Sequence, residues 1–262
     1  VLGRSLLKAL YPDTTYCNNS GGEPADIPTL TWEELKAFHA SYYHPSNAWF
    51  YTYGDQPLEK ILPFICERVL DHFDYLEVDS KVHSQPRWDV PRQVTQKYAY
   101  ADSADAAKKY QACLAWLCCD IKNSFDVLVM TILEQILLGH AASPLRKALI
   151  ESNLGSALSD SSGFDADNRD TSFACGLKDI EKKDAPKVEQ LIIDTIQNLV
   201  DNGIDPKMID SAIHQIEFHR KEITNTPYPF GIKLLLSFAG TVIHDGDPVS
   251  CINIDDDLDR VK

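Results

Sequence analysis

The sequence predicts an α+β fold in which antiparallel sheets are covered by helices. Three observations support this prediction. Strand-like segments come in groups, helical segments separate and follow those groups, and a polar turn between two strands suits antiparallel pairing. The 262 residues, 44% of them hydrophobic, are enough for one large domain or two modest ones with a core.

The first predicted helix carries four leucines on one face and stops at Pro12. A polar loop with two adjacent glycines follows. The next helix begins with Thr31 as N-cap and Glu34 at the third helical position, which is the pattern of a capping box. It ends at His44, because Pro45 disfavours helical geometry there. One buried stripe is expected along this helix, formed by Leu35, Phe38, His39 and Tyr42.

Residues 47–55, "NAWFYTYGD", predict a strand that turns at Gly54-Asp55. Another helix then begins near Pro57, and its apolar residues follow helical spacing. The segment 75–92 has two prolines and no hydrophobic period, so it is interpreted as a linker.

A second pattern starts after this linker. Residues 93–101 and 108–120 predict strands, and 125–137 predict a strongly apolar helix that ends at Gly139. Ser143 and Pro144 then open a further helix, which Gly155 is expected to close.

The remaining residues predict two short strands around a polar turn within 155–179, and three more helices. The first helix covers 188–199, and the second starts at Asp205-Pro206 and runs to Pro227. The third contains 232–238 and ends at "HDGD", 244–247.

The net charge of −14 makes nucleic acid an improbable partner, because phosphate repels an acidic surface. Solubility explains this charge better than a cationic peptide ligand does. No apolar run reaches the length of a membrane span, and the N-terminus reads as an amphipathic helix rather than a signal peptide. Seven cysteines without a CxxC pair indicate reduced thiols in a cytosolic or organelle-matrix protein.

His39 and His44 are candidate metal ligands, since both lie within "FHASYYHPSN". Five residues of helix turn through about 500°, which leaves the two side chains about 140° apart. Pro45 also takes His44 off the helix. A structural role for both histidines is favoured.

The stretch "HQIEFH", 214–219, superficially resembles the zinc motif H-x-x-E-H. Its second histidine is displaced by one position, so His214 and His219 are again about 140° apart, with Glu217 between them. An amphipathic helix with polar residues facing water is the favoured interpretation.

Three acidic stretches are candidates for oxygen-rich sites: 163–170, 244–247 and 255–259. The last lacks the spacing and the glycine of a calcium loop, and a solvated acidic segment is expected there. No nucleophile elbow, P-loop or dinucleotide-binding motif is present. The prediction is therefore that this chain has no catalytic residue and no metal ligand, and its substrate-binding residues stay unknown.

Several stretches nevertheless resemble a known family. They are "SGGEPADIPTLTWEELKAFHASYYHPSNAWFYTYGD" at 20–55 and "SPLRKALIESNLG" at 143–155, with support from "LYPDTTY" at 10–16 and "HDGDP" at 244–248. Together they resemble the pitrilysin–insulinase class of zinc metallopeptidases, in its presequence protease branch, which includes falcilysin. The similarity extends across essentially the whole chain.

The resemblance implies a parent enzyme of four homologous α+β units, of the LuxS/MPP-like metallopeptidase type, around a chamber that admits unfolded peptides. Zinc would be held in the first unit by H-x-x-E-H and a later glutamate, and a zinc-bound water would attack the peptide bond. No H-x-x-E-H occurs here. This chain would then be a segment that helps to wall the chamber, with zinc in the parent enzyme and none bound specifically by this chain.

The resemblance also implies a domain division: 1–74 as the truncated C-terminal part of the catalytic-type unit, 75–93 as linker, and 94–262 as a second, metal-free unit, incomplete at its C-terminus. The expected partners are unfolded peptides and the remaining units of the parent, with no nucleic acid and no membrane. Self-association through 1–74 is expected because apolar surface would be exposed there.

Two alternatives stay open. One is a non-hydrolytic, peptide-binding or subunit-like module of the same fold. The other is a metal-binding protein that uses His214, Glu217 and His219. The expected compartment is reducing, either cytoplasm or a mitochondrial or plastid matrix.

Overall fold

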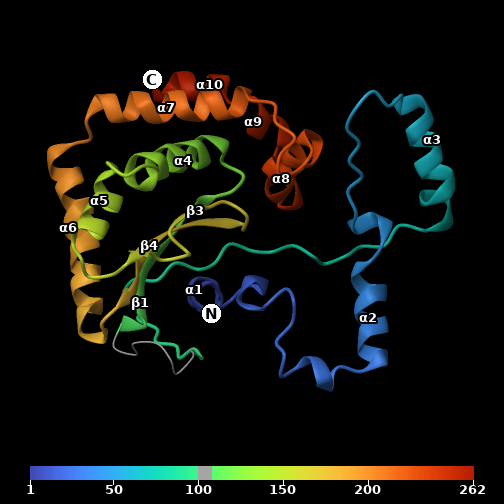
Figure 1. Cartoon of the computed structure of the whole chain (residues 1–262). Helices are drawn as coiled ribbons and strands as arrows, with labels where there is room; N and C mark the ends of the chain where they lie inside the picture. Colours follow the sequence, from blue (N-terminus) through green and yellow to red (C-terminus); the bar gives the residue numbers. More distant parts are fainter. Residues whose placement is uncertain (100–107) are drawn as a thin grey trace. The chain divides into compact units, whose positions relative to one another are not determined.

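A computed structural model describes residues 1–99 and 108–262 (Figure 1). These residues form two compact units. Unit 1 consists of Val1–Cys17, His83–Ile223 and Phe238–Lys262, and unit 2 consists of Asn18–Val82 and Thr224–Ser237. Within the described residues, every helix is too short or too polar to cross a lipid bilayer.

Unit 1 is built on a four-stranded antiparallel sheet. Strands β1 (Tyr110–Asp120) and β4 (Asp170–Ile180) pair along most of their length, and the short strands β2 (Ala157–Leu158) and β3 (Gly163–Asp165) pair with β4. The two long strands approach closely at Gly176, where an added Cβ would lie 2.0 Å from the carbonyl oxygen of Ala112. Only glycine fits this position.

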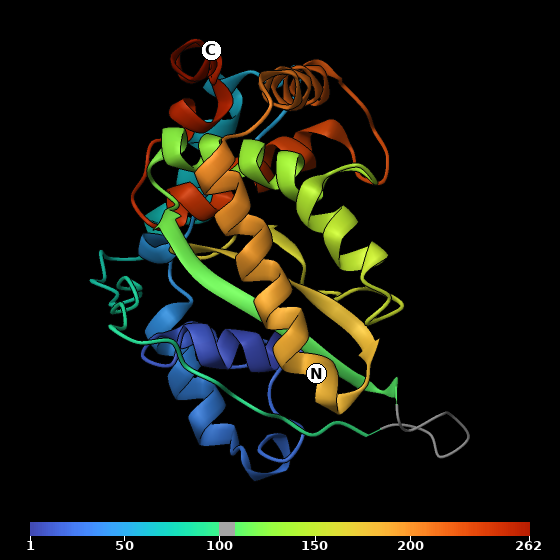
Figure 2. The same cartoon turned by 90° about the vertical axis from the view of Figure 1, so that its left-hand side faces the viewer.

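Helices cover this sheet and form the main core with it. They are α4 (Ser124–Leu138), α5 (Pro144–Glu151) and α6 (Ala185–Asn202). Helix α6 packs across β1 and β4, as Figure 2 shows, and α5 packs against α6. The fully buried side chains of this core come from the sheet, α5 and α6: Leu145, Leu149, Cys175, Leu177, Ile180, Val188 and Ile192.

A second core lies between α4, α7 (Pro206–Lys221) and α10 (Asp255–Val261). Its buried members from α4 are Leu128, Ile132 and Ile136. Because α4 buries side chains in both cores, its sequence is apolar nearly all round. Helix α8 (Phe230–Ile243) precedes the short helix α9 (Pro248–Ile252).

The N-terminal segment of unit 1 consists of α1 (Leu2–Leu10) and the 3-10 turn Thr15–Cys17. Helix α1 packs against β1. Leu10 is 5% exposed and Tyr11 is fully buried, so the end of this helix is anchored firmly in unit 1.

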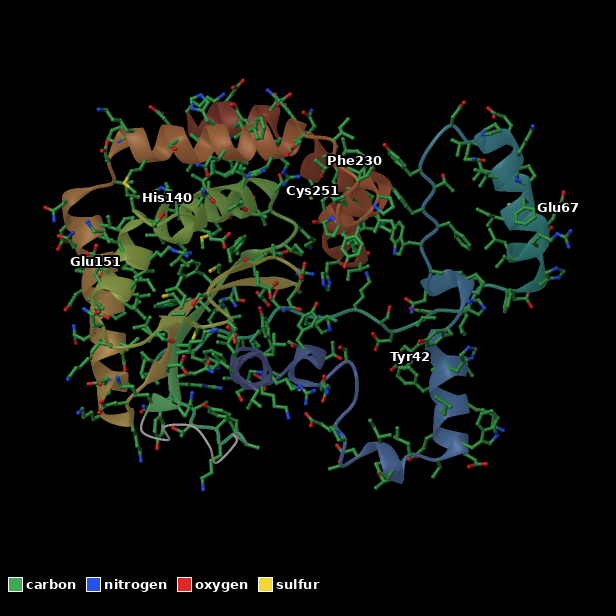
Figure 3. All side chains as sticks on the ribbon, viewed as in Figure 1. Tyr42, Glu67, His140, Glu151, Phe230 and Cys251 are labelled. Carbon is green, nitrogen blue, oxygen red and sulfur yellow. The ribbon has the colours of Figure 1, made fainter. Side chains whose placement is uncertain are left out.

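Unit 2 contains the helices α2 (Trp32–Tyr42) and α3 (Leu58–Arg68), three 3-10 turns (Ile27–Thr29, Pro45–Asn47 and Leu70–His72) and the first part of α8. Residue Tyr42 on α2 and residue Glu67 on α3 mark the two helices in Figure 3. No side chain of residues 18–82 is fully buried. The predicted capping box is confirmed: the Glu34 backbone N–H donates to Thr31 Oγ1, and the Thr31 N–H donates to Glu34.

Two predicted strands are wrong. Residues 48–53 form no strand, nor do residues 93–99, and 100–101 lie outside the described residues. Unit 2 contains no strand, so nothing in it supplies the neighbouring strand with which 48–53 would have to form a sheet. The predicted buried stripe of α2 is also wrong, since Leu35, Phe38 and Tyr42 are 59%, 55% and 40% exposed and His39 is exposed.

Three element boundaries differ from the predictions. Helix α5 ends at Glu151, before Asn153 adopts a positive φ, and not at Gly155. Helix α7 ends at Lys221 instead of Pro227, because the β-branched residues at 223, 224 and 226 are poor helix formers. Where two short strands were predicted within 155–179, three strands occur, and the long strand β4 extends to Ile180. Its residues 171–177 are buried on both faces, so no alternation marked it in the sequence.

The predicted solvated segment 255–259 belongs to α10 and buries Leu258. The compact units do not coincide with the predicted ranges 1–74, 75–93 and 94–262, since residues 1–17 belong to unit 1. Compactness within this chain and homology to other units are different properties, so that division stays a prediction.

Candidate functional site

A group of polar contacts in unit 1 surrounds Asp170, the first residue of β4, which is 3% exposed. Its Oδ2 accepts the backbone N–H of Gln85 at 2.6 Å, and its Oδ1 lies 3.0 Å from Nη2 of Arg87. The hydroxyl of Tyr11 donates to its carbonyl oxygen at 2.7 Å. A buried carboxylate is tolerated only with such partners.

Gln85 extends this arrangement, which we call the Asp170 cluster (Tyr11, Asp13, Gln85, Arg87 and Asp170). The Gln85 side chain donates from Nε2 to Asp13 Oδ2 at 2.6 Å and accepts the Asp13 N–H on Oε1 at 3.0 Å. Burial raises the pKa of Tyr11 to about 12, so its hydroxyl stays a neutral donor. The cluster ties residues 11–13 and 85–87 to the start of β4.

A second group of polar contacts lies beside this cluster. The hydroxyl of Tyr16 accepts the backbone N–H of Arg169 at 3.1 Å and lies 2.7 Å from Nε2 of His244. The guanidinium of Arg169 contacts Asp120 Oδ2 through Nη2 at 2.8 Å and through Nε at 3.1 Å. Burial is the main reason why the pKa of His244 is lowered.

These contacts hold segments of unit 1 together, and the polar atoms named are engaged with one another. The role that these contacts can perform is to hold backbone segments of unit 1 in position. Among the described residues, no group of three or more His, Cys, Asp or Glu side chains could hold a metal ion.

The two histidines of "FHASYYHPSN" lie in unit 2 in different settings. The ring of His39 stacks on Tyr43, with centroids 4.8 Å apart and planes at 14°. His44 accepts the Ser46 N–H on Nδ1 at 3.1 Å and contacts Phe73 edge-on. Each ring therefore makes local packing or turn contacts.

His214 and His219 both line a shallow depression of about 510 Å³ on α7, although the helical spacing predicts that they diverge. Glu217 does not line it. Its carboxylate forms an ion pair with Lys262 at 2.8 Å, and the hydrogen bond from Lys262 lowers its pKa. The zinc-like motif is thus divided between two environments.

The acidic stretches have structural roles in this fold. Residues 163–170 contain β3 and supply Arg169 and Asp170 to the polar contacts described above. Asp247 caps α9 by accepting the Val249 N–H at 2.9 Å. Sequence reasoning missed the contacts of Asp170, because its partners Gln85 and Tyr11 are 85 and 159 positions away. The only local signal was its place at the end of the acidic stretch 163–170.

The chain therefore has a mixed α/β fold with an antiparallel sheet and polar contacts of a structural kind. The family described as "Peptidase M16 inactive domain" matches residues 29–216. This chain belongs to that family. The match confirms the predicted resemblance and the prediction that the chain is a non-catalytic segment.

Several curated relatives match almost the whole chain. It is 38% identical over 263 residues to the mitochondrial presequence protease of Xenopus laevis, with 100% of this chain and 25% of that protein covered. The chloroplastic/mitochondrial presequence protease 1 of Arabidopsis thaliana is 36% identical over 270 residues, covering 100% of this chain and 24% of that protein. The chain thus spans about a quarter of the length of these relatives.

Solved structures share the fold. The M16 inactive domain from Pseudomonas fluorescens gives a TM-score of 0.68 at 18% identity, covering 99% of this chain and 58% of that one. A protease from Helicobacter pylori gives 0.69 at 17% identity, covering 98% and 62%. The predicted α+β fold class is confirmed.

Proposed function

We propose that this chain is the non-catalytic part of a zinc-dependent metalloendopeptidase that degrades short unfolded peptides, and that it helps to wall the peptide chamber. Its membership of the inactive-domain family carries the proposal. Support also comes from relatives that are named presequence proteases and are about four times as long.

Zinc would be held by other parts of the parent protein. The described residues do not fit the ion, because they bring no three suitable side chains together. Glu217, the residue that a zinc motif would need as general base, is engaged with Lys262. No step of the hydrolysis is therefore assigned to this chain.

The proposed partners are unfolded peptides and the remaining units of the parent. Exposed apolar side chains of unit 2 support contact with further polypeptide: Leu30, Trp32, Tyr43, Trp49 and Phe64 are each more than 60% exposed. The proposed compartment is an organelle matrix or the cytoplasm. Seven free cysteines suit reducing conditions, and the named relatives are mitochondrial or chloroplastic proteins.

A peptidase assay tests this proposal. The purified chain is incubated with a fluorogenic unfolded peptide and zinc, beside the full-length product of its gene. We expect chelator-sensitive cleavage by the full-length product and none by the chain alone. Chelator-sensitive turnover by the chain alone would contradict the proposal.

The alternative is a non-hydrolytic, peptide-binding or subunit-like module of the same fold. The reading frame upstream of Val1 separates the two. An encoded H-x-x-E-H favours the peptidase, and a complete gene without that motif favours the module.

A further inference from the structure

The function proposed above leaves His244 unexplained. This residue lies directly after α8, where its backbone N–H donates to the carbonyl oxygen of Thr241 at 3.2 Å. Gly246 closes the same turn by donating to that oxygen at 2.8 Å. His244 is 5% exposed, which is unusual for a side chain that titrates near neutral pH.

In the contact between Tyr16 and His244, we assign the hydroxyl as the donor and the ring nitrogen as the acceptor. The Tyr16 oxygen already accepts the backbone N–H of Arg169, so its single proton is free to point at Nε2 of His244. A ring nitrogen can accept that proton only if it carries none itself. With this assignment His244 is neutral and carries its own proton on Nδ1.

Protonation of His244 would disturb this contact. The Nε2 atom would become a donor facing the hydroxyl, and the Tyr16 proton would lose its acceptor inside a partly buried site. The charged ring would also be desolvated, with only partial compensation from nearby carboxylates.

We propose that the Tyr16–His244 hydrogen bond is a pH-sensitive latch of unit 1, which fastens the N-terminal segment 11–17 to the turn 244–246 and opens when His244 takes up a proton.

Some charged groups around the His244 ring lower its pKa, and others raise it. Arg169 and Lys122, near the ends of the two long strands, oppose a positive charge on His244, and they assist burial in lowering its pKa. Asp120 and Asp245 act in the opposite sense. Asp120 is paired with Arg169 at 2.8 Å, which limits its effect on the histidine. Burial raises the pKa of Tyr16, so the phenol stays neutral.

The direction of the pH effect follows from linkage. The pKa of His244 in the folded chain lies below its ordinary value of 6.5, so between these two values the unfolded chain binds more protons. Stability should be complete above pH 6.5, and it should fall as the pH falls from 6.5 through the folded pKa.

The experiment uses the full chain and three variants. His244→Gln keeps an uncharged acceptor at the Nε2 position, Tyr16→Phe removes the hydroxyl, and His219→Gln, on the exposed side of α7, is the matched control. The urea concentration at the midpoint of unfolding is measured at pH 7.5 and 5.5, and NMR titration gives the pKa of His244. Limited proteolysis reports cleavage within residues 1–17.

We expect the wild type and His219→Gln to lose stability at pH 5.5 and to gain cleavage within residues 1–17, whereas His244→Gln loses less. Tyr16→Phe should move the pKa of His244 upward, toward 6.5. A wild-type pKa at or above 6.5 would overturn the latch, as would an unchanged pKa in Tyr16→Phe. If a variant does not fold, the wild-type titration and the proteolysis at the two pH values still decide.

Discussion

Unit 1 and unit 2 differ in how their apolar residues are used. Unit 1 buries its apolar side chains in two cores around a sheet and α4. Unit 2 also has helices, and α2 has a complete capping box, yet the unit leaves large apolar side chains such as Trp32 and Phe38 exposed. Local sequence signals are therefore sufficient to specify a helix, whereas burial needs partner elements, which unit 2 does not contain.

The comparison predicts that the same substitution has different consequences in the two units. Leu177→Ala, at a fully buried position of β4, should lower the free energy of unfolding by about 2–5 kcal/mol, because it leaves a cavity. Leu62→Ala, on α3 and 56% exposed, should change it by less than about 0.5 kcal/mol. Urea denaturation measures both. Equal losses would show that unit 2 buries its leucines as unit 1 does.

Asp170 should produce the next largest effect, because its buried contacts are polar. Asp170→Ala leaves the Gln85 N–H without its acceptor and removes the partner of Arg87, and we expect a loss of about 1–3 kcal/mol. The matched control is Asp160→Ala, whose carboxylate is 74% exposed and pairs with Lys178. The control should show little measurable change, because exposed ion pairs contribute little. A loss in the control as large as that in Asp170→Ala would contradict the structural role of the cluster.

A smaller effect is expected in unit 2 from Thr31→Ala. The substitution removes one half of the capping box of α2, and this should cost about 1 kcal/mol of local helix stability. Amide hydrogen exchange within residues 34–42 measures it, with Ser41→Ala inside the same helix as control. Unchanged exchange would mean that contacts outside the cap hold α2.

The difference between local signals and long-range contacts also explains which parts of the structure could be predicted from the sequence. Helical periodicity and capping residues located α1, α4, α6 and α8 correctly, because those signals are local. The strand at 47–55 failed because strand formation needs a neighbour that unit 2 lacks. The Asp170 cluster and the Tyr16–His244 contact were missed because their partners are far apart in sequence, 228 positions in the latter case. The family was recognised from longer stretches, chiefly 20–55.

The smallest effect on stability, and the sharpest test of unit 2, comes from its exposed apolar side chains. Replacing Trp49, which is 72% exposed, by Gln should alter the free energy of unfolding by less than about 0.5 kcal/mol. The same change should weaken self-association of the isolated chain, because exposed apolar surface promotes contact between copies. Sedimentation velocity over a range of concentrations measures this association, with Val200→Gln as control, since Val200 is also 72% exposed but belongs to unit 1. If both variants weakened association equally, general surface hydrophobicity would explain it. If only Trp49→Gln did so, the contact would belong to unit 2, as the comparison of the two units requires.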